Sequence, residues 1–216
     1  MKLAIFDFDG TLLRGNSYHL FFRWVLRARP CRAPGLLFCL LLRRLRLVPA
    51  RFLKNRTLAV LHGLTGAEVS ALGRRLHDEL LAPRLRPAGL QEIAARRADG
   101  CGIVLVTGAF DFLVAPFAEA QAIATWRATG VAFRNGQCEG VIAGVELAGQ
   151  EKLRAVDDLF AGQTVDWAES WAYGDEEGDL FLLARVGHPV WVKSHRPVPR
   201  GLPPACKLAE WDSCPV

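Results

Sequence analysis

Short apolar runs alternate with helical patterns over most of the chain. The runs predict strands at 3–6, 102–106, 170–173 and 190–192. Between them, apolar residues at helical spacing predict helices at 89–99, 111–121, 152–160 and 180–185. Strands that alternate with helices are typical of a parallel sheet covered on both faces. The pattern therefore predicts an α/β fold with a Rossmann-like, doubly wound parallel sheet.

The stretch from Tyr18 to about Leu81 differs, because it contains no convincing strand pattern. Apolar residues recur there at helical spacing, as in Leu72, Leu76 and Leu80. Prolines and glycines divide the stretch into three or four helices. We expect an all-helical domain at 15–86, inserted into a core formed by 1–14 and 87–216.

Two further segments have local signals. Residues 131–143 predict a β-hairpin, because Asn135–Gly136 is a favoured two-residue turn. The proline-rich tail from Pro197 onwards is expected to be irregular.

Charge is distributed unevenly along the chain. The net charge is +5, but residues 14–86 carry 15 Lys and Arg against three acidic residues, and the remainder is net acidic. This asymmetry supports a division into two units. The N-terminus lacks a signal-peptide pattern, and the longest uncharged apolar run, Leu36–Leu42, is too short to span a bilayer. The prediction is a cytoplasmic protein.

The sequence FDFDG places two carboxylates, Asp7 and Asp9, at the end of a buried strand. Residues two apart on an extended chain share a face, so the two charges would lie close together. Such a pair is unfavourable unless one group is protonated or a cation lies between them. Thr107 and Asp175 also fall at the carboxyl ends of predicted strands, the edge at which open α/β sheets bind ligands.

Four motifs occur in a fixed order along the chain. They are DFDGT at Asp7–Thr11, Thr107–Gly108 after a strand, Lys152 at the start of a helix, and GDEEGD with Asp175 and Asp179. This set resembles the haloacid dehalogenase (HAD) superfamily of phosphohydrolases. A helical insertion after the first motif and a hairpin before the lysine resemble its phosphoserine-phosphatase-like branch, subfamily IB.

The resemblance implies a role for each motif residue. Asp7 would be the nucleophile that forms an aspartyl-phosphate, and Asp9 the general acid and base. Thr107 and Lys152 would bind the phosphoryl oxygens, helped by the backbone at Gly10 and Gly108. The metal would be Mg²⁺, and its ligands Asp7, the Asp9 carbonyl and Asp175, supported by Asp179.

Ordinary structural interpretations remain for single motifs. Asp175 and Asp179 could cap the following helix, and a lone lysine such as Lys152 is usually solvated. Lys193 is a rival to Lys152, but it follows the acidic loop and so falls out of order. Glu176 departs from the small polar residue usual in this family, and with Glu177 it leaves the metal-ligand set open.

The helical insertion resembles the cap that selects the substrate in this family. The stretch GLLFCLLLRRLRLVP could bind an anionic lipid surface, and some IB relatives act on lipids such as phosphatidylglycerophosphate. The alternative that we favour from the sequence makes Leu36–Leu42 the buried interior of the cap and the arginines a solvated face.

The predicted function is hydrolysis of a small phosphomonoester. Alternatives are phosphoryl transfer to another acceptor and a non-catalytic protein that binds anions or membranes on the same scaffold. The insertion has no recognisable nucleic-acid-binding motif, so no nucleic acid is expected.

Overall fold

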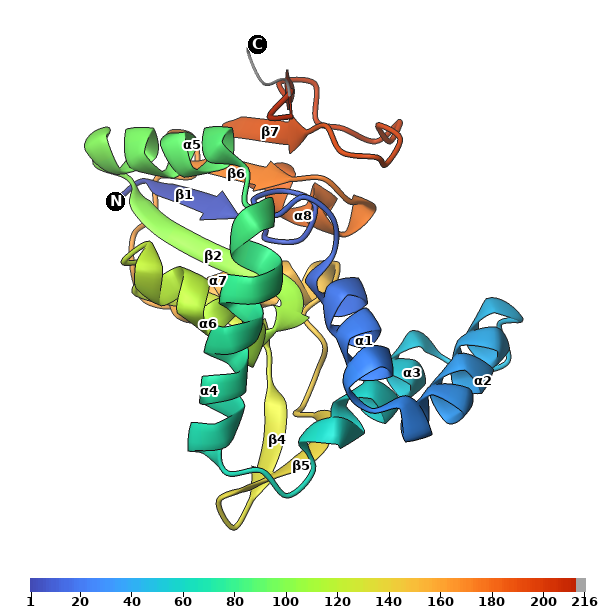
Figure 1. The fold of residues 1–216 in the computed structure, drawn as a ribbon. Coiled ribbons are helices and arrows are strands. Elements are labelled where there is room, and N and C mark those ends of the chain that lie inside the picture. Colours follow the sequence, from blue (N-terminus) through green and yellow to red (C-terminus); the bar gives the residue numbers. More distant parts are fainter. Residues whose placement is uncertain (213–216) are drawn as a thin grey trace.

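The computed structural model describes residues 1–212. Its centre is a six-stranded parallel sheet with strand order β3-β2-β1-β6-β7-β8 (Figure 1). The strands are β1 (Leu3–Phe6), β2 (Gly102–Phe110), β3 (Thr125–Thr129), β6 (Trp171–Gly174), β7 (His188–Val192) and β8 (Lys207–Ala209). This confirms the predicted parallel α/β sheet.

Helices cover both faces of the sheet. The core helices are α5 (Pro87–Ala98), α6 (Asp111–Ala120), α7 (Gln150–Leu159) and α8 (Leu180–Leu183). Leu3 and Ile5 of β1 belong to one buried cluster with Val156 of α7. Ala4 and Phe6 belong to the other cluster, which contains residues of α5 and α6. The two faces of β1 are therefore both buried, which is why β1 reads as a continuous apolar run.

The predicted insertion contains four α-helices. They are α1 (Ser17–Ala28), α2 (Ala33–Arg44), α3 (Ala50–Leu58) and α4 (Gly66–Leu76), with short 3₁₀ or π turns at Pro30–Arg32, Ala59–Leu61, His77–Leu81 and Ala82–Arg84. Helices α1, α2 and α3 project away from the sheet, whereas α4 runs beside α6 (Figure 1). Gly73 permits this contact, because a Cβ there would lie 2.0 Å from the carbonyl oxygen of Phe112.

The hairpin is also as predicted. Strands β4 (Val131–Arg134) and β5 (Gln137–Ile142) pair antiparallel. Asn135 and Gly136 both have positive φ angles, 51° and 78°, as a tight two-residue hairpin turn requires. The hairpin packs against α3, so it connects the insertion with the core.

Three details of the sheet differ from the sequence prediction. Strand β2 continues through Thr107 and Gly108 to Phe110, although its pairing with β3 is irregular between Val106 and Phe110. Strand β3 was not predicted, because this edge strand has only one fully buried residue. The prediction of an irregular tail is wrong for β8, whose backbone pairs with β7; three residues are too few for a readable hydrophobic period.

Candidate active site

The loop after β1 places the first motif at the carboxyl edge of the sheet. Asp7 directly follows β1, and Asp175 directly follows the neighbouring strand β6. Gly10 has φ +81°, and a Cβ there would lie 2.1 Å from Asp175 Oδ2, so only glycine fits. The buried guanidinium of Arg86 donates hydrogen bonds to the carbonyls of Gly10 and Thr11 (2.6 and 3.1 Å) and holds the loop in place.

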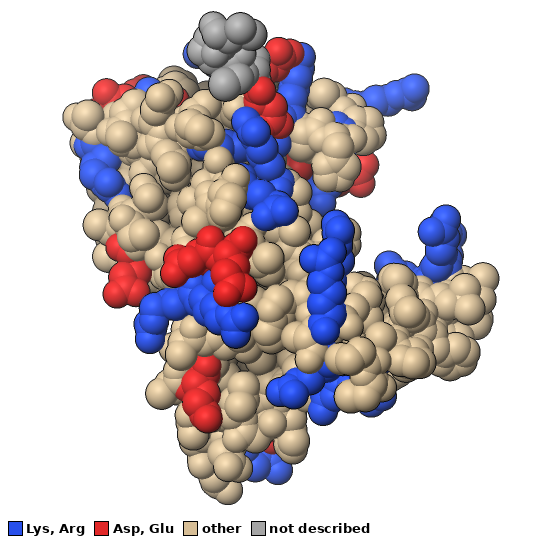
Figure 2. All heavy atoms as spheres, in the orientation of Figure 1, with Lys and Arg blue, Asp and Glu red and all other residues tan. Residues whose placement is uncertain are grey.

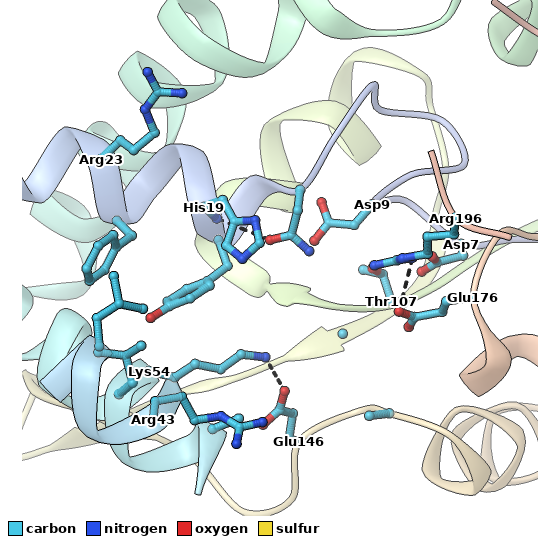
Figure 3. A pocket seen from close by; sticks show the side chains of 18 residues that line it. Asp7, Asp9, His19, Arg23, Arg43, Lys54, Thr107, Glu146, Glu176 and Arg196 are labelled. Atoms are coloured by element: carbon cyan, nitrogen blue, oxygen red, sulfur yellow. Dashed lines mark hydrogen bonds and ion pairs between the residues drawn. The ribbon is translucent and has the colours of Figure 1, made fainter. Parts of the chain in front are cut away.

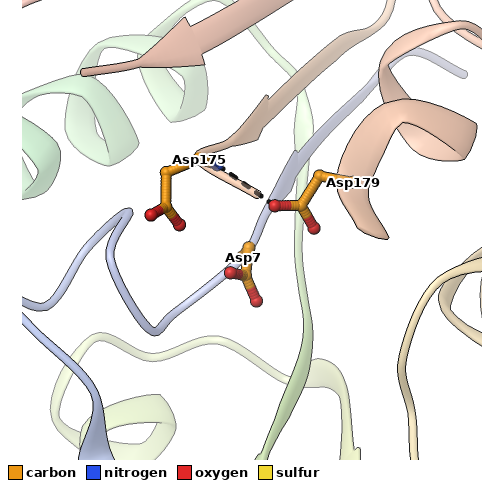
Figure 4. A group of neighbouring side chains, drawn as sticks. All are labelled: Asp7, Asp175 and Asp179. Carbon is orange, nitrogen blue, oxygen red and sulfur yellow. Dashed lines mark hydrogen bonds between the residues drawn. The ribbon is translucent and has the colours of Figure 1, made fainter. Parts of the chain in front are cut away.

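Three buried carboxylates converge at this edge. Oxygens of Asp7, Asp175 and Asp179 lie within 4.8 Å of one another (Figure 4). Asp179 Oδ2 accepts hydrogen bonds from the backbone amides of Asp175 and Glu176, both 3.1 Å. Asp7 Oδ1 has no hydrogen-bond partner among residues 1–212 although it is buried. Three clustered carboxylates, one of which has an oxygen that accepts no hydrogen bond, supply the oxygen ligands that a hard cation such as Mg²⁺ prefers, so these residues fit that ion.

Lys152 lies behind the same cluster and is fully buried. Its Nζ is 2.6 Å from Asp179 Oδ1 and 3.0 Å from Asp7 Oδ1. The Asp7 contact lacks hydrogen-bond geometry and is an ion pair. Burial alone would lower the pKa of Lys152, but Asp179, Asp7 and Glu176 raise it well above its usual value. These carboxylates therefore favour the charged form of Lys152 beside Asp7.

The pKa of Asp7 is also displaced. Burial raises the pKa of Asp7 well above the usual value of an aspartate, and Lys152 offsets this only in part. The other three carboxylates of the site raise it further. A cation bound among them would favour the charged form of Asp7.

Asp9 faces the open side of the site (Figure 3). Its two oxygens accept hydrogen bonds from the backbone amide and the hydroxyl of Ser17, at 2.8 and 2.9 Å. Burial raises the pKa of Asp9 to about 6, against the effect of these hydrogen bonds. Asp9 can therefore exchange a proton near neutral pH. Ser17 carries no sequence signal for this contact, since its role depends on where α1 begins.

Thr107 and Gly108 form another wall of the site. The Thr107 hydroxyl oxygen accepts a hydrogen bond from the backbone amide of Ala109 (3.2 Å). Its own hydrogen is therefore free to be donated to a ligand. A Cβ at Gly108 would lie 3.0 Å from the carbonyl oxygen of Leu147, so the backbone is closely packed there.

The acidic loop contributes one unexpected pair. Arg196 lies 2.9 Å from Asp175 Oδ2 and 3.2 Å from Glu176 Oε2. Glu176 lines the cavity, whereas Glu177 is exposed. Sequence reasoning missed Arg196, which belongs to the segment after β7 and to no motif. Lys193, the rival to Lys152, pairs with Glu210 and is not among the cavity-lining residues.

A cavity of about 810 Å³ opens in front of these groups. Asp7, Asp9, Thr107, Gly108 and Glu176 line its inner end, whereas Gly10, Lys152, Asp175 and Asp179 lie behind the wall. The outer part comes from α1, α2 and α3. Its basic residues are His19, Arg23, Arg43 and Lys54 (Figure 3).

One ion pair crosses the cavity between the insertion and the core. Lys54 of α3 pairs with Glu146, in the segment before α7 (Figure 3). Beside it, Phe22, Leu40 and Leu53 form an apolar wall. The cavity therefore joins an anion-binding inner end to an outer part that is both basic and apolar.

Comparison with known proteins identifies the family. The family model of haloacid dehalogenase-like hydrolases matches residues 4–184. The chain belongs to this family. It is 33% identical over 196 residues to Protein CicA of Caulobacter vibrioides, covering 84% of this chain and 82% of that protein.

Solved structures share the fold. A protein of unknown function from Bordetella pertussis Tohama I superposes with a TM-score of 0.78 and 25% identity, over 89% of this chain and 90% of that one. A substrate-bound phosphoserine phosphatase superposes with a TM-score of 0.66 and 16% identity, over 95% of this chain and 92% of that one. The predicted membership of the HAD superfamily and the phosphoserine-phosphatase-like fold are confirmed.

Proposed function

We propose that this HAD-like hydrolase is a phosphatase that hydrolyses a small phosphomonoester through a covalent aspartyl-phosphate on Asp7. The observation that carries the proposal is the position of Asp7, between Lys152 and Asp175 at the inner end of a cavity that Asp9 also lines. We take residues 15–86 as the cap over this core.

The first step makes one bond and breaks one. A carboxylate oxygen of Asp7 bonds to phosphorus while the ester P–O bond breaks. The leaving oxygen takes a proton from Asp9, whose pKa of about 6 allows it to carry one. The Thr107 hydroxyl and the Lys152 ammonium stabilise charge on the phosphoryl oxygens.

The second step reverses the proton movement. A water molecule gives a proton to the Asp9 carboxylate as its oxygen bonds to phosphorus. The bond between phosphorus and Asp7 then breaks, which releases inorganic phosphate and restores the Asp7 carboxylate.

The carboxylate cluster would hold Mg²⁺. Asp7, Asp175 and the Asp9 carbonyl are the proposed ligands, and Asp179 orients the loop through its hydrogen bonds to the amides of Asp175 and Glu176. Bound there, Mg²⁺ would reduce the charge repulsion between Asp7 and an incoming phosphate.

The test is phosphate release from p-nitrophenyl phosphate, phosphoserine, and sugar and nucleoside monophosphates, with Mg²⁺ or with EDTA. We expect turnover that requires Mg²⁺ and falls roughly a thousandfold or more in Asp7→Asn. Acid quenching of the wild type should trap a phosphorylated enzyme that Asp7→Asn does not form. Unchanged turnover in Asp7→Asn would refute the proposal.

The same assay separates the alternative activities. If the phosphorylated enzyme disappeared only when an acceptor molecule was added, and no inorganic phosphate was released, phosphoryl transfer would be favoured. Binding of Mg²⁺ without any turnover would favour a non-catalytic anion-binding protein. No nucleic-acid substrate is proposed.

The apolar wall of the cavity supports a second candidate substrate, a phosphate monoester with a lipid body. Phe22, Leu40 and Leu53 could contact an acyl or glycerol chain beyond the phosphate site. Phosphatidylglycerophosphate in micelles, compared with glycerol phosphate at equal concentration, tests this choice. A higher kcat/KM for the lipid that Leu40→Ser abolishes would support it, and equal values would exclude it.

A further inference from the structure

Helix α2 carries an apolar face that nothing covers among the described residues. Leu37, Phe38 and Leu41, at i, i+1 and i+4, lie on one side of the helix, and Leu45, at i+8, directly follows its last residue. Their exposed fractions are 50, 60, 51 and 58%. We call these four residues the α2 apolar face.

The opposite side of α2 is buried. Leu36 and Cys39 are 5 and 7% exposed and belong to the core cluster that also contains Leu53 of α3. The interpretation of Leu36–Leu42 as a buried interior therefore holds for these two residues only, and the exposed residues of that run still lack a partner.

The charge around this face is of one sign. Residues 10–67 contain no aspartate or glutamate. The segment that carries α2 and its flanks supplies these arginines: Arg29, Arg32, Arg43, Arg44, Arg46 and Arg51. Helix α2 stands away from the sheet, and in the view of Figure 2 its surface is uncharged or basic, without acidic side chains.

We propose that the α2 apolar face inserts into the interface of an anionic phospholipid bilayer, with the adjoining arginines on the lipid phosphates. Exposed leucines and phenylalanine beside arginines are the pattern of an interfacial helix. Each basic side chain near an anionic surface adds to the attraction.

A second copy of the chain is a less suitable occupant of this face. Docking two such faces would bring the arginines of both copies together, and the segment offers no carboxylate to pair with them. An anionic bilayer supplies both the apolar layer and the opposite charge.

The helix lies in the membrane surface and does not cross it. Helix α2 has 12 residues, about 18 Å at 1.5 Å per residue, against about 30 Å of bilayer hydrocarbon. Among the described residues, no helix has both the length and the apolar character to cross a bilayer. Leu40 and Arg43 of the same helix line the cavity. Docking would therefore hold the cavity within about the width of one helix, roughly 10–12 Å, of the lipid surface.

This inference goes beyond the proposed hydrolysis and is independent of it. Membrane attachment needs no chemistry at Asp7, and a phosphatase acting on dissolved substrates would not need the α2 apolar face.

The test is co-sedimentation of the full chain with vesicles of phosphatidylcholine alone and with one third phosphatidylglycerol. We expect binding to the anionic vesicles only, weakened by salt. Phe38→Ser/Leu41→Ser should reduce the partition coefficient about tenfold or more, since two inserted side chains are lost. Arg44→Gln/Arg46→Gln should reduce it about fivefold for each arginine.

Matched controls lie elsewhere on the surface. Phe181 and Leu208 are exposed to 47 and 51%, and the double variant Phe181→Ser/Leu208→Ser should bind as the wild type does. Turnover of p-nitrophenyl phosphate should be unchanged in Phe38→Ser/Leu41→Ser, which separates loss of docking from loss of the active site.

Three outcomes would overturn the proposal. They are absence of binding to anionic vesicles, equal binding by Phe38→Ser/Leu41→Ser, and a dimer in sedimentation velocity that the same variant dissociates. The last outcome would identify a second copy of the chain as the occupant.

Discussion

The amino group of Lys152 is fully buried beside the carboxylates of Asp7 and Asp179. Lys152→Met would keep a side chain of similar length and leave both carboxylates without their cation. Breaking a buried pair in this way costs about 3–5 kcal/mol. We expect a markedly lower free energy of unfolding in urea, partly restored by Mg²⁺.

Lys193→Met is the matched control for that variant. The Lys193–Glu210 pair is largely exposed, at 42 and 61%, and exposed pairs contribute little. Equal destabilisation by both variants would contradict the buried-pair interpretation of Lys152.

The pKa of Asp9, about 6, predicts the pH dependence of the first chemical step. Asp9 must be protonated to donate to a leaving group, and its protonated fraction falls as pH rises above 6. The rate of phosphoenzyme formation from an alkyl phosphate should therefore fall up to tenfold per pH unit above that value. Rapid-quench measurements between pH 5 and 8 test this.

The control for that prediction is a change of substrate. The p-nitrophenolate ion leaves without a proton, so its rate should lack the high-pH decline. Identical profiles for alkyl and p-nitrophenyl phosphate would remove Asp9 from the role of acid.

Arg196 places a positive charge on Asp175 and Glu176. A second cation at the same carboxylates is disfavoured by repulsion, so Arg196→Gln should tighten Mg²⁺ binding about tenfold at low salt. The same variant should raise KM for an anionic substrate. Titration calorimetry with Mg²⁺ measures the first effect, and Arg185→Gln, an exposed pair with Asp157, should leave the affinity unchanged.

Residues differ in how far the sequence reveals them. Local motifs predict six residues of the site, and the fold brings all six to one edge of the sheet. They are Asp7, Asp9, Thr107, Lys152, Asp175 and Asp179. Ser17 and Arg196 could not be predicted from a motif. A loop brings each of them to the site, and no sequence spacing indicates the course of that loop.

At the scale of elements, the contact between α4 and α6 depends on Gly73. Alanine normally stabilises a helix by about 1 kcal/mol relative to glycine. At Gly73, however, the Cβ would lie 2.0 Å from the carbonyl oxygen of Phe112, so Gly73→Ala should destabilise the protein despite its helix propensity. Thermal melting measures the effect.

Gly35 of α2 provides the opposite case. A Cβ there would have no heavy atom of another residue within 4 Å, so Gly35→Ala should stabilise the protein by roughly 0.5–1 kcal/mol. A higher melting temperature for Gly73→Ala than for Gly35→Ala would show that α4 and α6 separate readily.

Strongly periodic elements could be predicted, and marginal ones could not. Strand β1 and helix α7 carry clear patterns because their partners bury whole faces. Strands β3 and β8 at the two edges of the sheet depend on backbone pairing, and the pattern of side chains along the sequence does not reveal such pairing. In helix α2 the sequence pattern misleads in the other direction. It favours a buried position for the apolar run Leu36–Leu42, but most of this run lies on the surface.

At the scale of the molecule, positive charge is concentrated in the insertion that forms the outer cavity, whereas the rest of the chain is net acidic. Fixed charges of one sign raise the local concentration of an anionic substrate and its association rate. The inner end, by contrast, contains five carboxylates, of Asp7, Asp9, Asp175, Glu176 and Asp179, and, among the described residues, only two cations, Lys152 and Arg196. Attraction at the mouth and repulsion at the inner end therefore act at different depths of one cavity.

The attraction at the mouth should be visible as a salt dependence of kcat/KM. The Debye length falls from about 20 Å to about 7 Å between 20 and 200 mM salt, so kcat/KM for a dianionic phosphomonoester should fall roughly fivefold. Arg23→Gln/Arg43→Gln removes two charges from the cavity wall and should flatten this dependence. Arg127→Gln removes an exposed charge on β3, outside the cavity, and should not. If all three proteins showed the same slope, the charge of the insertion would act on another partner, and the basic surface beside the α2 apolar face would be the place to seek it.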